Sequence, residues 1–208
     1  MDITYLGAGS VKLSGKSINV VCDPFTEKAG LGKLNVKADV VTLSTLEGLA
    51  EAAAAMVIDG PGEYEVKGAM ITGVPARLHI DEDGTRATVY SIRIDGVNVV
   101  VTGNIAGKLD NKEVGLLGNV DVLVVPVGGA GLTLDAEGAA AVITQFEPSY
   151  VVPVHYDDGK TKYEMPQDKL DLFLKEMGSS PEPESKLKVN AKEAPAETQV
   201  VVLKRAGE

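Results

Sequence analysis

The sequence is poor in several residue types, and each shortage excludes a class of structure. Its 208 residues include one cysteine, two histidines, no tryptophan and only 4% aromatic residues. The single Cys22 cannot form an intramolecular disulfide, which suits a reducing compartment. Because Cys22 follows a valine-rich segment, we expect a buried and unreactive thiol. With so few aromatic residues, the core must be built mainly from Val, Ile, Leu and Ala.

Positive charge and long apolar runs are also scarce. Lys and Arg number 20 against 30 Asp and Glu, which gives a formal net charge of −10. Proteins that bind nucleic acid usually carry a basic patch, so we expect no nucleic-acid partner. No run approaches the ~20 apolar residues that cross a bilayer, and the N-terminus does not resemble a signal peptide. We therefore expect a cytoplasmic protein with no membrane partner.

The pattern along the chain predicts one domain over residues 1–208, with a mixed α/β architecture. Short apolar segments separated by glycine turns predict strands. Alanine-rich or periodic segments predict helices at 48–56, 134–146 and 166–177, the second with Asp135 as its N-cap. The expected strands are 3–6, 17–21, 37–43, 63–66, 69–74, 88–94, 97–102, 121–126, 150–154, 186–189 and 198–204.

Six short motifs stand in order along the chain: Ile3-Thr-Tyr-Leu-Gly7, Asp23-Pro-Phe25, Gly60-Pro-Gly-Glu-Tyr-Glu65, Gly103-Asn104, Val125-Pro-Val-Gly-Gly129 and Val152-Pro-Val-His-Tyr156. Their order resembles the metallo-β-lactamase superfamily, in its branch of small single-domain predicted zinc-dependent hydrolases. The resemblance covers essentially the whole chain. It implies an α/β (α+β) fold, a four-layer αββα sandwich with a two-metal site at one edge.

The main metal-binding motif of that superfamily is altered in this chain. In active relatives, the segment that aligns with residues 44–50 reads Ser-His-x-His-x-Asp-His and supplies most of the metal ligands. Here the three histidine positions hold Thr45, Glu47 and Ala50, and the aspartate position holds Leu49. The resemblance therefore implies a retained scaffold from which most of the ligands have been lost.

The remaining ligand positions are only partly kept. His155 stands at the retained histidine of the Pro-x-His-Tyr motif, while Asn104 replaces the aspartate that bridges two metals in active relatives. The middle-loop histidine position falls on Leu78, one residue before His79. In a strand, a shift of one residue turns a side chain to the other face. His155 is therefore the one ligand that the resemblance carries over clearly.

These substitutions favour a catalytically inactive pseudoenzyme that acts as a binding or assembly module. On this hypothesis the chain forms a homo-oligomer, folds without metal and needs no cofactor. No catalytic residue is assigned, and Thr45, Glu47, Leu49, Ala50, Asn104 and His155 form a vestigial site.

Two alternatives remain open. One is a hydrolase with a reduced metal site around His155, Glu47 and Asn104, with His79 as a further candidate ligand. Such an oxygen-rich set would bind Zn²⁺ or Mn²⁺ weakly. Glu47 is otherwise a solvated acid in the first turn of a helix. The other alternative is a site that binds a small molecule without turnover, in which His155 and Asn104 hold a polar group.

Two local interpretations can also be tested. Asp23 precedes a proline after a strand, and an aspartate in such a turn usually accepts hydrogen bonds from backbone amides. His155 could act as a general base for Ser44 or Thr45 if the fold brings them to the same rim. We expect the first interpretation to hold and nucleophilic catalysis to be absent.

Overall fold

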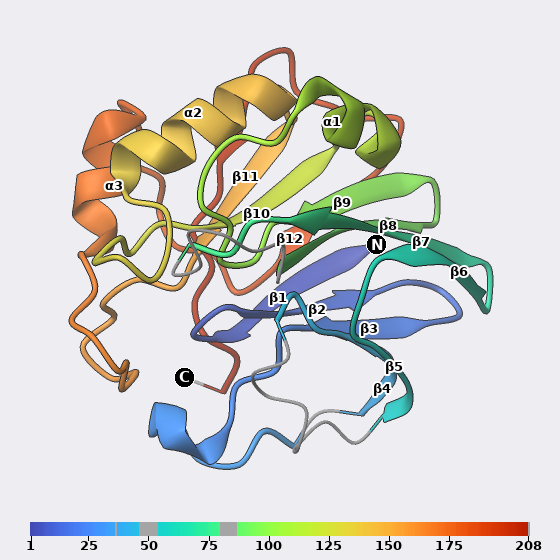
Figure 1. Cartoon of the computed structure of the whole chain (residues 1–208), viewed down its shortest axis with the longest axis horizontal. Coiled ribbons are helices and arrows are strands. Elements are labelled where there is room, and N and C mark those ends of the chain that lie inside the picture. The colour runs from blue at the N-terminus through green and yellow to red at the C-terminus, as the bar shows by residue number, and fades with distance from the viewer. Residues whose placement is uncertain (36, 46–53, 80–86, 208) are drawn as a thin grey trace.

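The computed structural model describes residues 1–35, 37–45, 54–79 and 87–207, which form two stacked β-sheets (Figure 1). The first sheet has six strands in the order β12-β1-β2-β3-β4-β5. Its strands β12, β1, β2 and β3 pair antiparallel, whereas β3, β4 and β5 pair parallel. The strands are β1 (Asp2–Gly7), β2 (Ser10–Ser14), β3 (Asn19–Cys22), β4 (Ala38–Thr42), β5 (Ala54–Ile58) and β12 (Leu187–Lys188).

The second sheet has seven strands in the order β13-β11-β10-β9-β8-β7-β6. Strands β6 to β9 form an antiparallel meander, and β9, β10, β11 and β13 pair parallel. The strands are β6 (Gly62–Val66), β7 (Ala69–Ala76), β8 (Ala87–Ile94), β9 (Val97–Val101), β10 (Val122–Pro126), β11 (Tyr150–Val154) and β13 (Gln199–Val200).

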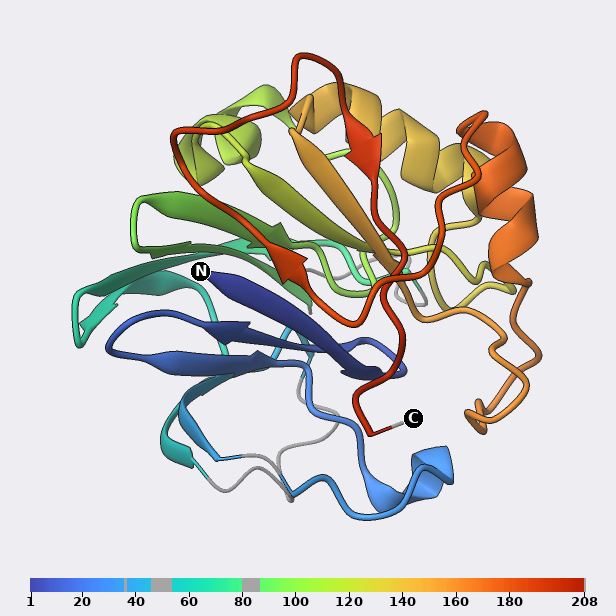
Figure 2. The same cartoon turned by 180° about the vertical axis from the view of Figure 1, so that it is seen from behind.

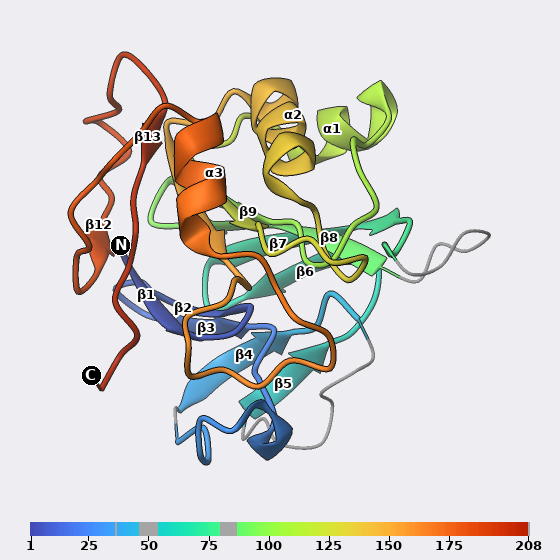
Figure 3. The same cartoon turned by 90° about the vertical axis from the view of Figure 1, so that its left-hand side faces the viewer.

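The described helices cover the outer face of the second sheet (Figure 3). They are α1 (Asn111–Leu117), α2 (Ala136–Phe146) and α3 (Leu170–Glu176), and a single 3-10 turn, η1, spans Glu27–Ala29. Helix α2 buries Ala139, Val142, Ile143 and Phe146, a helical spacing that places one apolar stripe against the sheet. None of the described helices is long and apolar enough to cross a bilayer.

The central strands of the second sheet are apolar on both faces because each face packs against another layer. In β10, Val122 and Val124 join the core between the two sheets, whereas Leu123 and Val125 join the core under the helices. This explains the continuous apolar run that predicted a buried strand. Cys22 is fully buried in the core between the sheets, and burial raises the pKa of its thiol to about 12. The expectation of a buried cysteine is thus confirmed, and the raised pKa agrees with the expected low reactivity.

The C-terminal segment closes both sheets. Seen from behind in Figure 2, the red end of the chain runs beside both layers, close to the N-terminus. Strand β12 pairs with β1 in the first sheet, and β13 pairs with β11 in the second. The expected strand at 198–204 is shorter than predicted, because ladder pairing covers only Gln199–Val200. The chain continues as isolated bridges, such as Tyr5 with Arg205.

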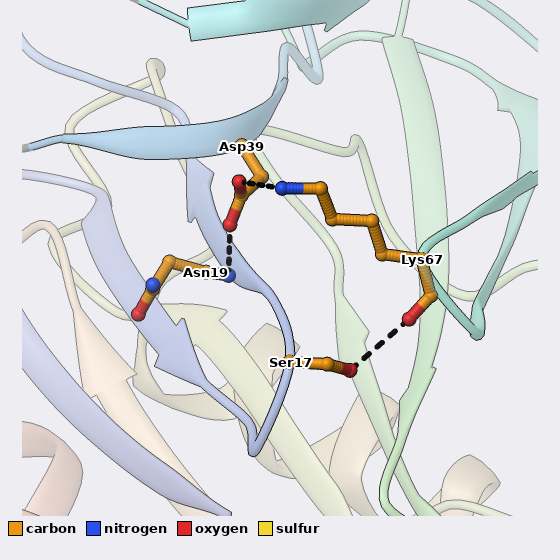
Figure 4. A network of polar contacts seen from close by, with 4 residues as sticks. All are labelled: Ser17, Asn19, Asp39 and Lys67. Atoms are coloured by element: carbon orange, nitrogen blue, oxygen red, sulfur yellow. Dashed lines mark hydrogen bonds and ion pairs between the residues drawn. The ribbon is translucent and has the colours of Figure 1, made fainter.

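A polar network joins the sheets where β3 and β4 begin (Figure 4). The Asp39 carboxylate accepts a hydrogen bond from the Asn19 backbone N–H at 2.8 Å and pairs with the Lys67 ammonium. The Ser17 hydroxyl donates to the Lys67 carbonyl oxygen at 3.1 Å. Lys67 lies in the turn between β6 and β7, so this network connects a turn of the second sheet to strands of the first. The Lys67 ammonium lowers the pKa of Asp39.

Two of the expected helices need correction. The alanine-rich segment 48–56 predicts a helix, but its described residues 54–56 belong to β5, where Ala54 pairs with Ala38 and Met56 with Val40. Parallel pairing with β4 outweighs the helix propensity of alanine; residues 48–53 lie outside the described residues. The helix expected at 166–177 begins only at Leu170, because a β-bridge between Asp157 and Lys169 holds the preceding segment extended. Strand β2 and helix α1 were not predicted.

Candidate functional site

A cavity lies between the two sheets, where β3, β4, β9, β10 and β11 end. It has a volume of about 160 Å³ and includes residues that follow four of these strands, among them Asp23, Ser44, Gly103 and His155. In α/β sheets, side chains at the carboxyl ends of parallel strands meet at one edge, and ligands commonly bind there. We call this space the inner cavity.

A wider cavity of about 600 Å³ adjoins the inner cavity, and we call it the outer cavity. Both cavities include Ala8, Pro24, Phe25, Thr45, Asn104 and His155 in their linings. The rest of the outer cavity is lined by the segment around η1, the loop that follows β11, Leu78 and Leu132. His155 and Asn104 therefore stand where a narrow polar space meets a larger one.

His155 is held in one orientation by its neighbours. Its backbone N–H donates to the Ala8 carbonyl at 2.7 Å, and its Nδ1 lies 3.2 Å from Gln167 Oε1. The Gln167 amide nitrogen donates to the Met165 carbonyl at 3.1 Å, which turns Oε1 toward the imidazole. We infer from this arrangement that Nδ1 carries the ring proton, so Nε2 keeps its lone pair.

The surroundings of His155 also favour its neutral form. The imidazole packs against the Tyr163 ring, with the two ring centroids 4.6 Å apart. Burial lowers the pKa of His155, although the hydrogen bond with Gln167 opposes the shift. A Cβ at Gly128 would lie 2.3 Å from the His155 carbonyl oxygen and 2.5 Å from Gln167 Oε1. Glycine at position 128 therefore makes room for the pair that Gln167 and His155 form.

Asp23 orders the start of the altered motif, as the sequence interpretation expected. Its Oδ1 accepts a hydrogen bond from the Ser44 backbone N–H at 2.6 Å, and the Ser44 hydroxyl also bonds to the Asp23 carboxylate. Asp23 takes a left-handed backbone conformation with φ 46°. Burial raises the pKa of Asp23 to about 6, against the opposing effect of the hydrogen bonds with Ser44.

The pairing of Ser44 or Thr45 with His155 that nucleophilic catalysis would require is not formed among the described residues. Across the described ranges, no hydrogen bond joins Ser44 or Thr45 to His155. The Ser44 hydroxyl is engaged by Asp23, and it packs where a Cβ on Gly103 would lie only 2.2 Å from Ser44 Oγ. A tightly packed hydroxyl that donates to a carboxylate is poorly placed to attack a substrate.

The structure brings three of the sequence-derived site residues together. Thr45, Asn104 and His155 line both cavities. Leu78 lines the outer cavity, whereas His79 lines a separate cavity beside Lys108 and Leu134. The offset of one residue inferred from the sequence therefore agrees with the structure, and His79 does not join the other three. Glu47, Leu49 and Ala50 lie outside the described residues.

The donors in the cavities do not fit a two-metal centre. Within the described ranges, no group of three or more His, Cys, Asp or Glu side chains is placed to hold a metal ion. Among the described residues that line both cavities, His155 Nε2, the Asn104 amide oxygen and the Thr45 hydroxyl offer one nitrogen and two neutral oxygens, whereas the Asp23 carboxylate of the inner cavity is hydrogen-bonded to Ser44. A dinuclear zinc site needs more ligands than these, and usually charged ones. This donor chemistry fits one weakly held hard cation at most.

Sequence reasoning did not identify Gln167 and Tyr163, which touch His155. Both lie in the stretch that follows β11, with Tyr163 eight and Gln167 twelve residues after His155. That stretch carries no recognised motif, and Gln167 falls in a segment for which a helix was expected. The sequence does not show that Gln167 is buried, because its burial depends on how the loop folds.

The sheet pairings and the site define a metallo-β-lactamase-type sandwich. A family model described as a beta-lactamase superfamily domain matches residues 2–155, about three quarters of the chain. The chain belongs to this superfamily.

Relatives extend the similarity over more of the chain. A UPF0173 metal-dependent hydrolase of Natranaerobius thermophilus is 26% identical over 189 residues, covering 76% of this chain and 84% of the relative. A Thermotoga maritima structure assigned to the Zn-dependent hydrolases of the metallo-β-lactamase superfamily is 31% identical, with a TM-score of 0.80 and 98% of each chain covered. Igni18, a metallo hydrolase of Ignicoccus hospitalis, is 21% identical with a TM-score of 0.59. The match covers 75% of this chain and 82% of Igni18, and at this identity it supports the fold alone.

The comparisons confirm the fold and the superfamily that the motifs indicated. They give no support to the pseudoenzyme hypothesis, because the relatives are named metal-dependent hydrolases. Of the interpretations drawn from the sequence, the hydrolase with a reduced site agrees better with these names.

Proposed function

We propose that this protein is a hydrolase that works from a reduced site centred on His155. One observation carries the proposal: Gln167 holds the Nδ1 side of the imidazole, and the ring lines a cavity together with Asn104 and Thr45. Hydrolysis needs a base near a positioned water, and a neutral histidine with an available Nε2 meets that need. The superfamily membership supports the same class of reaction.

The side chains that line the cavity can take different roles in hydrolysis. His155 Nε2 accepts a proton from the attacking water, and the lowered pKa of His155 keeps it neutral and competent near pH 7. The Asn104 amide and the Thr45 hydroxyl provide a donor and an acceptor to orient the water and the substrate oxygen. Tyr163, packed on the imidazole, limits the movement of the base.

A single divalent cation held by His155 would occupy the Nε2 lone pair, and it would then supply Lewis-acid activation of the water or of the substrate oxygen in place of the imidazole base. We propose His155, Asn104 and Glu47 as the residues that hold it, since Glu47 follows the cavity residue Thr45 by two positions. One imidazole with oxygen donors suits Mn²⁺ about as well as Zn²⁺. Such a site would be weak and exchangeable compared with the centres of active relatives.

The test combines metal content with activity. The purified protein is measured by mass spectrometry before and after incubation with Zn²⁺ and with Mn²⁺, and is assayed with p-nitrophenyl esters and phosphates. We expect His155→Ala to lower both metal uptake and turnover, the latter by about 100-fold, the usual scale for loss of a general base. His79→Ala is the matched control, because His79 lines a separate cavity.

The opposite result would restore the first hypothesis. Metal content that stays far below one ion per chain and is unchanged in His155→Ala, with no turnover of any substrate, would point to a pseudoenzyme that binds or assembles. Homo-oligomer formation is a separate proposal, which sedimentation velocity over a range of protein concentrations would test.

A further inference from the structure

Two lysines meet at the outer cavity from distant parts of the sequence. Lys28 belongs to η1, and Lys162 belongs to the loop that follows β11; both line the outer cavity together with His155. The Lys162 backbone N–H donates to the Ala29 carbonyl at 2.8 Å, which joins the two segments. Figures 1 and 3 show the orange loop lying beside the blue segment that carries η1.

The Lys162 side chain is held by packing. Its aliphatic stem lies over Gly30, where an added Cβ would be 2.9 Å from Lys162 Cδ and 3.0 Å from Cγ. Gly30 has a φ of 72°, a conformation that glycine adopts without strain. The stem of a lysine can lie along the protein surface in this way while its ammonium group stays in water. Glycine at position 30 thus allows Lys162 to stay at the cavity.

The charged residues described around this cavity leave the ammonium groups of Lys28 and Lys162 available to bind an anion. Among the described residues, neither Lys28 nor Lys162 makes an ion pair. Glu164 also lines the outer cavity, and its negative charge offsets part of the positive charge of the two lysines. Two nearby acids are already engaged: Asp23 binds Ser44, while Asp158 accepts hydrogen bonds from Lys160 and Thr161. In a chain with a net charge of −10, the described part of this rim holds two ammonium groups that form no ion pair, beside the single carboxylate of Glu164.

The rest of the outer cavity is suited to an apolar group. Phe25, Leu78 and Leu132 line it, and its volume of about 600 Å³ falls in the range of small-molecule sites. The cavity therefore offers three kinds of surface: an apolar wall, a rim with two lysines, and the polar pair His155 and Asn104.

We infer that the outer cavity binds small organic anions, molecules that join an apolar body to a phosphate or carboxylate group. The anionic group lies at Lys28 and Lys162, and the apolar body lies against Phe25, Leu78 and Leu132. The inference rests on the proposed function and gives that function a substrate class. Because binding does not require turnover, the two can be tested apart.

Binding is measured by calorimetry on the full chain with phenyl phosphate, phenylacetate and the neutral 2-phenylethanol. We expect the two anions to bind and the neutral compound to bind at least about fivefold more weakly, since two exposed charge pairs each contribute modestly. Lys28→Met with Lys162→Met keeps the aliphatic stems and removes both charges, and should weaken the anions by a similar factor. Lys112→Met with Lys188→Met, two exposed lysines elsewhere, is the matched control.

The outcomes separate the two proposals. Equal binding of phenyl phosphate and phenylacetate to the wild type and to the Lys28, Lys162 variant would overturn the inference, as would equal binding of 2-phenylethanol. Anion binding that depends on the two lysines and is retained in His155→Ala, without turnover of any p-nitrophenyl compound, would uphold the inference and contradict the proposed hydrolase.

Discussion

At the scale of single residues, the site depends on polar side chains that are held by partners outside the familiar motif. Gln167 lies within hydrogen-bond distance of the His155 imidazole, and Asp23 accepts a hydrogen bond from Ser44, each in a partly buried setting. The two contacts restrict the side chains without any metal. Burial, opposed by these hydrogen bonds, shifts the pKa values of His155 and Asp23, and Asp23 gives the clearest measurable consequence.

The free energy of unfolding should depend on pH through Asp23. The pKa of Asp23 is raised to about 6 in the folded protein, above the ordinary value of 3.8. The folded state therefore holds this proton more tightly than the unfolded state, and the contribution of Asp23 to stability falls as pH rises from about 4 to above 6. A pKa shift of this size corresponds to a total change of roughly 3 kcal/mol in the free energy of unfolding.

The measurement is chemical denaturation of Asp23→Asn and of the wild type from pH 4 to pH 7. We expect the stability of the variant relative to the wild type to rise by roughly 2 kcal/mol across this range, most of the full effect. Asp39→Asn serves as a control of opposite sign, because Lys67 lowers the pKa of Asp39. Parallel pH profiles for Asp23→Asn and the wild type would contradict the elevated pKa.

At the scale of elements, the inner cavity forms because neighbouring parallel strands end at the same edge of the sheet and the loops after them are held by hydrogen bonds. The parallel strands β9, β10 and β11 deliver Gly103, Pro126 and His155 to one edge. The loop after β10 passes Gly128 and then enters α2 through Asp135. The start of α2 is thus part of the same framework that holds Gln167 and His155 in place.

The N-cap of α2 should contribute measurably to the free energy of unfolding. Asp135 Oδ1 accepts a hydrogen bond from the Gly138 backbone N–H at 2.8 Å. We expect Asp135→Ala to lower the free energy of unfolding by about 1 kcal/mol, the usual cost of losing a cap. Asp135→Ser keeps a capping oxygen and should recover most of that loss in urea denaturation. Equal losses in the two variants would show that packing, rather than capping, explains the role of Asp135.

At the scale of the whole molecule, stability comes from the core between the two sheets. That core is built from aliphatic residues of both sheets and closed by the C-terminal strands β12 and β13. Burial of apolar surface is the main favourable contribution to folding. Across the described ranges, no cluster of three potential ligands contributes a metal crosslink.

Chelation should therefore leave thermal stability almost unchanged. A weak cation near His155 adds little to stability at micromolar metal, because the gain depends on the ratio of free metal to its dissociation constant. We expect the Tm with EDTA to agree within about 1 °C with the Tm in 10 µM Mn²⁺ or Zn²⁺. A fall of several degrees with EDTA, reversed by added metal, would show that a metal ion supports the fold.

The sequence by itself determined the features that depend on neighbouring residues. The alternation and apolar runs located β10 and β11, the cap at Asp135 marked the start of α2, and the Asp23 turn was assigned from its proline. The motif order was enough to identify the superfamily, and it predicted that Leu78 rather than His79 faces the site. Each of these is local, or follows from the alternation of side chains along one strand.

Only the tertiary structure decided the features that join distant segments. Pairing with β4 makes Ala54–Ile58 a strand although its alanine neighbours favour a helix. Gln167 reaches His155, and the Lys162 backbone bonds to Ala29, because loops from different parts of the chain fold against each other. Such contacts leave no periodic signal in the sequence, since their energy comes from pairing and packing that exist only after the sheets have assembled.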